Sequence, residues 1–523
     1  MSAARAKIAP VSARTLRVSV AVVLASQAAL GGAAARAAGG GWSSPTPLSR
    51  CGAAIAPRVA FPGESPSIPT GPGAIVWAQD PACAGGSAQA TLGVSVAALR
   101  PDERTTLSGS ELLPVSPSGT LAAVGASRGR VAVAVTLGGP ASSRSITLLQ
   151  GRSTRPLGAG TVISGSLFSL AHAYLGDAAI ATVLPGVAIE VRVERYFRSE
   201  FGQPQRIPIE AGRVSALTAT MDYRSDVLLA WQQHGAIYAH MLRASGRPEA
   251  TQRIGVSAPD PQLRALVSDN DHGMIAWSSA NGPAPGATSV RIAFSGAGVR
   301  FAGSRLVASF ADPQGAGRAP GALALVRLST ENVMLAWTDS EHGHYVVRAA
   351  PAVFAGTRPP ARLSDPAARS VLADLAPGPA GEAVALWSAT PAASFERSRN
   401  ELWAARAFVE RHGRVGFSAP ELVAPAAANA ASSVAVDPAS DRALAAWLVL
   451  GARTTVEYAS GRGASGYRPQ AATASTGTAT QWLQITLACV AAAAIGAVIV
   501  VALRRRARGR SPAGANTGRR RRR

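Results

Sequence analysis

One stretch of the chain matches a pattern that carries nucleophilic serines in hydrolases. Residues 125–129 read Gly-Ala-Ser-Arg-Gly, which fits G-x-S-x-G around Ser127. In that motif the serine oxygen is exposed because it lies on a strained turn between a strand and a helix. Here the apolar run at 131–135 follows, which predicts a strand, and no helical pattern comes after it. We therefore expect a plain hairpin turn at Ser127.

A second stretch has the carboxylate density of a calcium loop. Residues 269–273 read Asp-Asn-Asp-His-Gly. Asp and Asn also recur in tight turns, because their side chains bond to the backbone of the turn. A calcium loop of the EF-hand type needs about twelve residues and a terminal glutamate, and this stretch has no such continuation. The pattern favours a turn, and we predict no metal ligand.

His342 and His344 are the other candidates for binding chemistry. They lie two positions apart and could together meet a metal or a sugar, but their place after an apolar run favours a solvated hairpin turn. General acid–base catalysis needs carboxylates that converge on one cavity. Residues from distant parts of a chain can form such a set, and the sequence does not reveal it. We therefore predict no catalytic residue, no metal site and no cofactor.

Any functional group in this chain must be positioned by a repeated element, a short apolar run that closes on tryptophan. In five such runs the closing tryptophans are separated by 46, 60, 50 and 60 residues, a mean of 54. An earlier run also ends on tryptophan, and two runs ending at Val135 and Thr182 hold the same place without it. The six repeated tryptophans are Trp77, Trp231, Trp277, Trp337, Trp387 and Trp447. A period of this length is typical of radial or stacked repeats.

Each repeat is built from short strands. In the unit around Trp231, strands are predicted at 214–221, 227–231 and 237–243, and a glycine-rich link leads to a fourth. Four antiparallel strands per unit match a β-propeller blade. The sequence thus predicts an all-β propeller over 41–469, with eight blades, or seven if one tryptophan-free copy is not a blade. At the end of a buried strand, tryptophan favours core packing over stacking on carbohydrate.

The start of the array predicts how the ring closes. Residues 41–48 resemble the fourth-strand motif at 416–422, yet they precede the first unit. We expect them to complete the last blade, which would remove the exposed sheet edges. Cys51 and Cys83 follow strands at this seam, so we predict a disulfide between them; the alternative is two free thiols. Closing this loop of about 32 residues would stabilise the fold by roughly 3–4 kcal/mol.

The net charge of +22 is concentrated at the two ends of the chain. Residues 1–37 carry five positive charges, an apolar centre and an A-x-A site, which is typical of a secretion signal peptide. Residues 470–481 read as a small-residue linker. Residues 482–503 contain no charge, which predicts a transmembrane helix. The chain is therefore expected to be a single-pass cell-membrane protein.

A basic tail over 504–523 sets the orientation of that helix. It holds ten arginines, beginning with Arg504, Arg505 and Arg506. Basic residues stay cytoplasmic, so the body is expected outside the cell and the C-terminus inside. Attraction of the tail to anionic lipid headgroups explains its charge better than nucleic-acid binding. We predict membrane lipids as partners and no nucleic acid.

The repeating order of acidic turn, apolar run, tryptophan, turn, strand and F-x-x-P resembles the divergent β-propellers of secreted bacterial proteins. Sialidase-type propellers carry the box S-x-D-x-G-x-T-W, and 268–277 comes nearest to it, with a longer spacing and without the threonine. No arginine triad can be assigned, so the resemblance does not imply sialidase activity. The end of the chain resembles a sortase sorting signal but lacks LPxTG.

These features favour a cell-surface module that binds or scaffolds an extracellular protein or glycan ligand. The alternative is a surface glycan hydrolase or lyase with its site on one face of the propeller. Carboxylates and arginines gathered over the central channel would favour the enzyme, whereas a sparse channel mouth would favour binding.

Overall fold

In the computed structural model, the described part of the chain runs from residue 41 to residue 461, with gaps between strands, of which 62–72 and 80–91 are the longest. This part consists of strands and their connections, so the all-β prediction is confirmed. Among the described residues, no helix has the length and apolar character that crossing a membrane requires. The predicted signal peptide, linker, transmembrane helix and basic tail lie outside the described residues.

The strands form eight antiparallel sheets, numbered here in chain order. Sheet 1 contains β2 (Arg58–Ala60), β3 (Gly73–Gln79), β4 (Leu92–Leu99) and β5 (Thr106–Val115). Sheet 2 contains β6 (Leu121–Ala126), β7 (Arg130–Thr136), β8 (Ser145–Arg152) and β9 (Thr161–Ser164). Sheet 3 contains β10 (Phe168–His172), β11 (Ala178–Leu184), β12 (Ala188–Glu194) and β13 (Gln205–Pro208). Sheet 4 contains β14 (Val214–Met221), β15 (Val227–Gln233), β16 (Ala236–Leu242) and β17 (Gln252–Val256). Sheet 5 contains β18 (Gln262–Val267), β19 (Gly273–Ser279), β20 (Ala287–Phe294) and β21 (Arg305–Ala311).

The last three sheets depart slightly from this pattern. Sheet 6 contains β22 (Ala324–Arg327), β23 (Asn332–Glu341) and β24 (His344–Val353), with β25 (Gly356–Thr357) and β26 (Ala361–Arg362) both paired to β24. Sheet 7 contains β27 (Arg369–Gly378), β28 (Glu382–Thr390) and β29 (Asn400–Val409), with β30 (Val415–Phe417) and β31 (Glu421–Ala427) both paired to β29. Sheet 8 contains β32 (Ser432–Val436), β33 (Ala443–Val449), β34 (Thr455–Gly461) and β1 (Thr46–Ser49).

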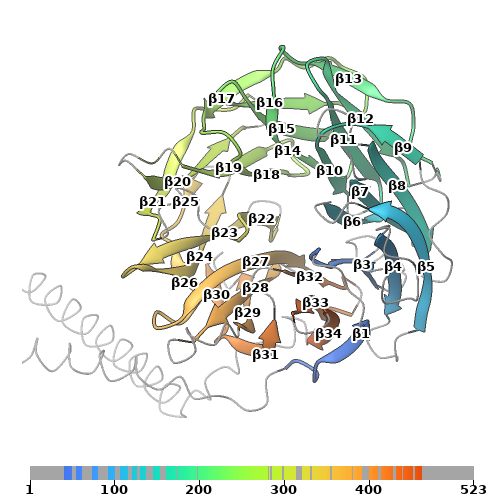
Figure 1. The fold of residues 1–523 in the computed structure, drawn as a ribbon. Coiled ribbons are helices and arrows are strands. Elements are labelled where there is room, and N and C mark those ends of the chain that lie inside the picture. The colour runs from blue at the N-terminus through green and yellow to red at the C-terminus, as the bar shows by residue number, and fades with distance from the viewer. Residues whose placement is uncertain are drawn as a thin grey trace, which may run out of the picture. The chain divides into compact units, whose positions relative to one another are not determined.

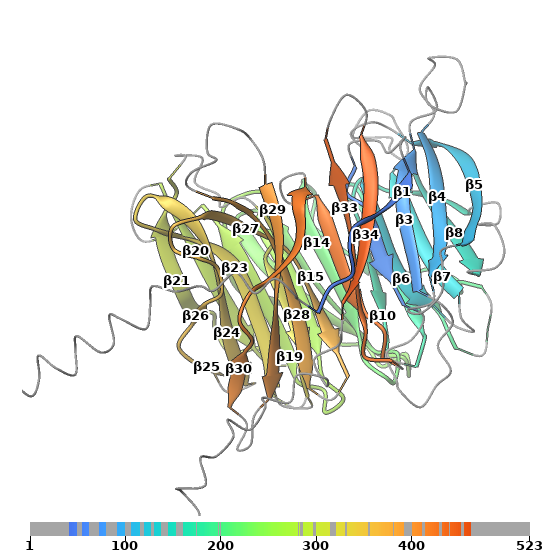
Figure 2. The same cartoon turned by 90° about the horizontal axis from the view of Figure 1, so that it is seen from below.

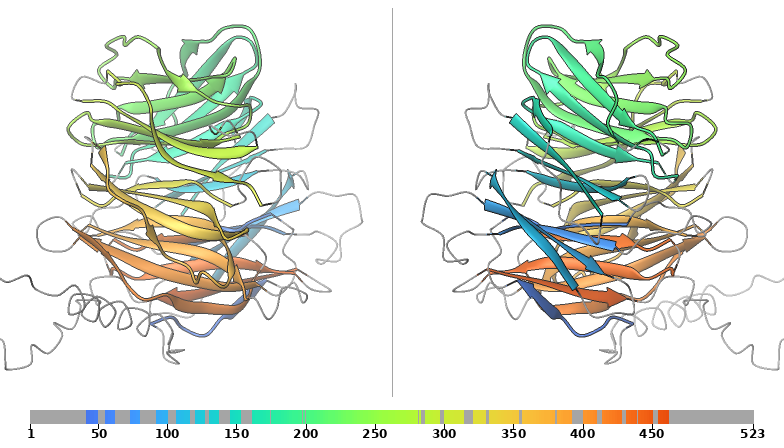
Figure 3. Two further views of the ribbon diagram at one scale, coloured as in Figure 1. Left: turned by 90° about the vertical axis from the view of Figure 1, so that its left-hand side faces the viewer. Right: turned by 90° about the vertical axis from the view of Figure 1, so that its right-hand side faces the viewer.

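The first strands of the sheets contact one another in a closed circuit. Strand β2 touches β6, and the contacts continue in chain order through β10, β14, β18, β22 and β27 to β32, which returns to β2. Figure 1 shows the sheets following one another in this order. We call these eight first strands the inner strands. The side views show neighbouring sheets stacked face against face (Figure 3). This is the arrangement of β-propeller blades.

The N-terminal strand completes the last sheet, as predicted. Strand β1 pairs antiparallel with β34, with Thr46 opposite Tyr458. Ahead of it, the Ser43 amide donates to the Ser460 carbonyl at 2.7 Å. Trp42 lies so close to Gly461 that a Cβ atom added to Gly461 would stand 2.8 Å from the indole ring of Trp42. Figure 2 shows β1 beside β34. One sheet thus combines the first and last strands of the described chain.

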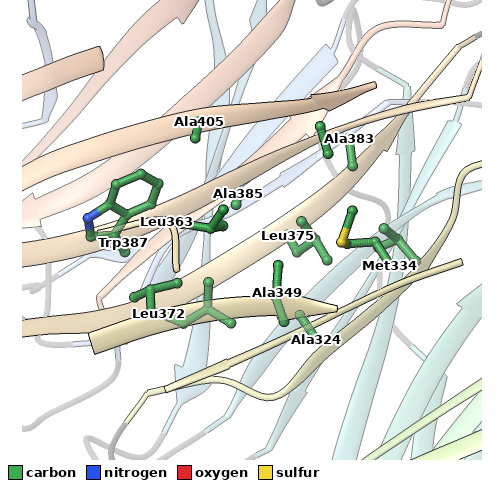
Figure 4. Close-up of a cluster of buried hydrophobic side chains, with 14 of the residues drawn as sticks. Ala324, Met334, Ala349, Leu363, Leu372, Leu375, Ala383, Ala385, Trp387 and Ala405 are labelled. Atoms are coloured by element: carbon green, nitrogen blue, oxygen red, sulfur yellow. The ribbon is translucent and has the colours of Figure 1, made fainter. Parts of the chain in front are cut away.

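The hydrophobic core is divided among the seams between sheets. Eight clusters of buried side chains are present among the described residues, and each combines two neighbouring sheets. Figure 4 shows the cluster between sheets 6 and 7, where Trp387 of β28 lies with Leu372 and Leu363. Because most apolar burial lies between sheets, the ring is stabilised as a whole and not sheet by sheet.

All eight copies of the sequence repeat lie on second strands. The six tryptophans are at most 2% exposed, and each packs into the seam between its own sheet and the preceding one. Val135 lies on β7 and Thr182 on β11, the equivalent strands of sheets 2 and 3. The period of the tryptophans therefore reflects one bulky side chain filling each of six seams.

Candidate functional site

The inner strands surround a cavity of about 810 Å³. All eight of them contribute lining residues. This places the cavity on the axis of the ring, and we call it the channel. Its size falls within the range of about 300–1,000 Å³ that is common for small-molecule sites. Its lining includes six charged residues, namely Arg58, Arg264, Arg327, Asp222, Asp269 and Asp374.

Three charged residues of the lining lie at one level of the ring. Arg58 of β2, Arg264 of β18 and Asp374 of β27 each stand opposite the residue that precedes the repeated tryptophan on the neighbouring strand. The repeat thus gives them equivalent places in sheets 1, 5 and 7. We call these three residues the channel layer.

The carboxylate of Asp374 is fully engaged by its surroundings. Its Oδ2 accepts hydrogen bonds from the Ser433 hydroxyl and the Val434 amide, both at 3.0 Å, and its Oδ1 accepts from the Leu375 amide at 2.9 Å. Two of these donors belong to β32, so Asp374 joins sheet 7 to sheet 8.

The two arginines of the channel layer have weaker partners. Arg264 donates from Nη1 to the carbonyl of its neighbour Leu263 at 2.9 Å, and Arg58 donates from Nε to the Leu121 carbonyl at 3.1 Å. No carboxylate among the described residues lies within 4.0 Å of either guanidinium. The surrounding protein lowers the pKa of Arg264, with the charge of Asp374 acting against the shift and that of Arg58 adding to it. Its side chain is nevertheless accessible from the channel.

A second charged group lies at the turns that join first and second strands. Asp222, Asp226 and Asp271 offer carboxylate oxygens within 4.8 Å of one another. Nη1 of Arg243 lies 2.8 Å from Asp226 Oδ2 and 3.0 Å from Asp271 Oδ1. The guanidinium therefore already supplies a positive charge to two of the three carboxylates, and it joins sheet 4 to sheet 5. We interpret this group as a structural ion-pair network.

Asp222 has the most unusual environment in that network. Its Oδ1 accepts hydrogen bonds from the amides of Arg224 at 2.9 Å and Asp226 at 2.8 Å, while its Oδ2 has no partner. Burial raises the pKa of Asp222 to about 6, although the bond from the Asp226 amide opposes the rise. Asp222 belongs to the lining of the channel, but its Oδ2 is closed off from solvent.

Other ion pairs at these turns also join neighbouring sheets. Arg327 Nη1 lies 2.8 Å from Asp269 Oδ1 across sheets 5 and 6. Arg130 Nη2 lies 2.5 Å from Glu194 Oε1 across sheets 2 and 3. The acidic turns predicted from the sequence thus bond between sheets as well as within their own turn. Asp271 belongs to such a turn and has a left-handed backbone, with φ of 60°.

Most of the other sequence candidates do not converge on a site. Gly125 and Ala126 end β6 and β7 begins at Arg130, while Ser127 lies outside the described residues. His342 lies in the turn after β23 with 80% of its side chain exposed, and His344 begins β24 with its Nε2 near the Pro366 carbonyl. The tryptophans are buried in the seams. Cys51, Cys83, Arg504, Arg505 and Arg506 lie outside the described residues.

A buried acid pair joins sheets 7 and 8. Glu382 begins β28, and Asp441 lies in the turn before β33. Burial raises the pKa of Glu382 to about 7; the charge of Asp441 and a hydrogen bond with it act in the same direction, and Arg406 acts against them. A bond between two carboxyl groups needs a proton, so the folded state favours protonated Glu382.

This pair predicts a pH-dependent stability. The pKa of Glu382 is higher in the folded state than its ordinary 4.5. The stabilisation of the fold by protonated Glu382 is therefore complete below about pH 4.5 and is lost as pH rises through about 7. Allowing for solvent screening, we expect the free energy of unfolding to fall by about 1–2 kcal/mol over this pH range. Glu382→Gln keeps a neutral donor, so its melting temperature should change less between pH 5 and 8. Glu200→Gln, at an exposed position, is the matched control. An unaltered pH profile in Glu382→Gln would contradict the assignment.

The channel layer was missed in the sequence. One signal was present: Arg264 and Asp374 each interrupt an apolar first strand, and Arg58 begins one. Aligning the repeats on their tryptophans places Arg264 and Asp374 at one position, 13 residues ahead of the tryptophan, whereas Arg58 lies 19 residues ahead of Trp77 because the connection between its strands is longer. Nothing in the sequence, however, indicates that Asp374 is occupied by sheet 8 while the arginines lack acidic partners.

Comparisons with known proteins give structural likeness at low identity. No family model matches the chain, and no curated protein matches it. A prolyl endopeptidase structure is 10% identical with a TM-score of 0.41, covering 77% of this chain and 54% of its own. NanB sialidase from Streptococcus pneumoniae, in a mutant form, is 8% identical with a TM-score of 0.38, covering 80% and 70%. An α-L-arabinanase from Penicillium chrysogenum is 12% identical with a TM-score of 0.28, covering 47% and 93%. The chain thus spans about half the length of the prolyl endopeptidase.

Proposed function

We propose that this protein is a cell-surface propeller on a single-pass membrane anchor, and that it binds an extracellular ligand through its channel. The observation that carries the proposal is the cavity of about 810 Å³ lined by two arginines that have no acidic partner among the described residues. Groups held ready for hydrogen bonding in a concave site are what ligand recognition needs. The uncharged 482–503 segment and the arginine tail support the anchor.

The charged groups favour binding over hydrolysis. A glycan hydrolase of the common type needs two carboxyl groups that both reach the scissile bond. In the channel layer the one carboxylate, Asp374, accepts three hydrogen bonds from the protein. At the turns, Asp226, Asp269 and Asp271 are paired with arginines. The raised pKa of Asp222 would suit a general acid, but its free oxygen is closed off from solvent.

The test begins with the orientation of the chain. Cells producing the full-length protein with a tag after Arg523 are treated with protease, either intact or permeabilised. We expect intact cells to lose the body and to keep a tagged fragment that contains the anchor and tail. Permeabilised cells should lose the tag as well. A body that resists protease on intact cells would contradict the surface location.

The second arm tests binding. The full-length protein, purified in a non-ionic detergent, is screened on arrays of extracellular glycans and proteins. We expect saturable binding to at least one array member without release of a product. Turnover of that member would support the hydrolase alternative, and the absence of any bound member would contradict the binding function.

A further inference from the structure

Arg264 combines enclosure with access. Protein surrounds it closely enough to lower its pKa, yet its side chain is exposed to the channel. Its one hydrogen bond among the described residues goes to the carbonyl of Leu263, at 2.9 Å. A guanidinium carries five N–H donors in a planar fork. Most of that donor capacity is therefore directed at the channel or its solvent, and not at the protein.

The channel layer has an excess of positive charge. Arg58 and Arg264 are close enough for their like charges to oppose each other, and Asp374 is the acid that interacts with Arg264. The oxygens of Asp374 already accept bonds from Ser433, Val434 and Leu375. Two cations and one anion leave one positive charge unbalanced at this level. Such a charge attracts an anion that enters the channel, because the protein walls reduce solvent screening.

We propose that the channel layer is an anion-binding site in which Arg264 is the principal ligand-binding residue and Arg58 the second, and that it takes a carboxylate or sulfate group of a small ligand. Both groups present paired oxygens to which a guanidinium donates two parallel hydrogen bonds. The proposal deepens the proposed binding function and rests on it, since it names the chemistry of the ligand that the channel accepts.

The probes are sodium glucuronate for the carboxylate, sodium sulfate for the sulfate, and glucose as the neutral counterpart of glucuronate. They are titrated into full-length protein in a non-ionic detergent at constant ionic strength, with calorimetry and thermal melting as readouts. We expect glucuronate, sulfate or both to bind saturably and to raise the melting temperature, and glucose to have no effect. The stronger of the two anions identifies the preferred group. If neither anion binds, the proposal is wrong.

Variants test whether binding occurs at this layer. Arg264→Gln should weaken anion binding at least tenfold, Arg264→Lys should weaken it less, and Arg58→Gln should weaken it as well. Arg253→Gln is the matched control, because Arg253 is exposed on β17, the outermost strand of sheet 4. Anion binding by Arg264→Gln that equals that of the unaltered protein would overturn the proposal.

A ligand-free measurement separates binding from a structural role. Because the cost of surrounding the Arg264 charge with protein outweighs its attraction to Asp374, Arg264→Gln without added anion should melt at the same temperature as the unaltered protein or higher. A clear drop would show that Arg264 supports the fold and would count against the proposal. An array ligand that still binds to Arg264→Gln would leave the binding function standing and reject the anion site alone.

Discussion

Deletion of residues 41–49 is expected to abolish the cooperative thermal unfolding of the protein. The segment contains β1, the fourth strand of sheet 8, and Trp42, which packs against Gly461. Leu48 is buried with Trp77 of sheet 1 in the seam between sheets 8 and 1. Loss of one buried leucine side chain costs about 2–5 kcal/mol. Together with the lost strand pairing, this approaches the whole stability of a typical domain, about 5–15 kcal/mol.

The measurement is calorimetric melting of the full chain with and without the deletion, together with light scattering. We expect a broadened or absent transition and increased aggregation, because β34 is left with an unpaired edge. Thr46→Ala is the control, since Thr46 is exposed on β1 and its hydroxyl bonds only locally, to the Ser44 carbonyl at 3.4 Å. A synthetic peptide of residues 41–49 should restore part of the transition. A normal melt after the deletion would mean that the strand does not hold the ring closed.

The repeat made the architecture predictable from the sequence. An apolar run that ends on tryptophan indicates both a buried second strand and a side chain that fills the seam beside it. This one signal therefore predicts the order of the sheets along the chain and the number of residues between them. In the unit around Trp231, the third strand begins at Ala236 and ends at Leu242, within one residue of its predicted limits. Even Val135 and Thr182, which lack the tryptophan, lie on second strands, because the apolar pattern is enough to bury a strand.

The candidate site was less predictable for a physical reason. Arg58, Arg264 and Asp374 come together because the inner strands of sheets 1, 5 and 7 face one axis, and no local pattern encodes that meeting. The acidic turns were correctly read as turns, but their side chains also bond to the next sheet, as Arg243 does with Asp271. Partners of this kind depend on the packing between sheets and not on the repeat itself.

Substituting Trp277 by alanine is expected to lower the free energy of unfolding by about 3–5 kcal/mol. The side chain is completely buried between sheets 4 and 5, and its Nε1 donates to the Val256 carbonyl on β17 at 3.2 Å. The substitution would leave a cavity in one of the eight seams and a carbonyl without its donor. Trp277→Phe keeps most of the apolar volume and should cost less. Denaturant unfolding of the full chain measures both.

Gly255 allows this packing to be tested from the opposite side of the seam. A Cβ at Gly255 would lie 2.6 Å from Cζ2 of Trp277, so Gly255→Ala should overpack the seam and cost about 1–3 kcal/mol. In the Trp277→Ala background the indole is gone, so the added methyl meets a cavity. The Gly255→Ala cost should then vanish or reverse, which a double-mutant cycle measures as a coupling of about 1–3 kcal/mol. Additive effects of the two substitutions would show that Trp277 does not pack on β17 as the structure places it, and that its burial arises elsewhere in the seam.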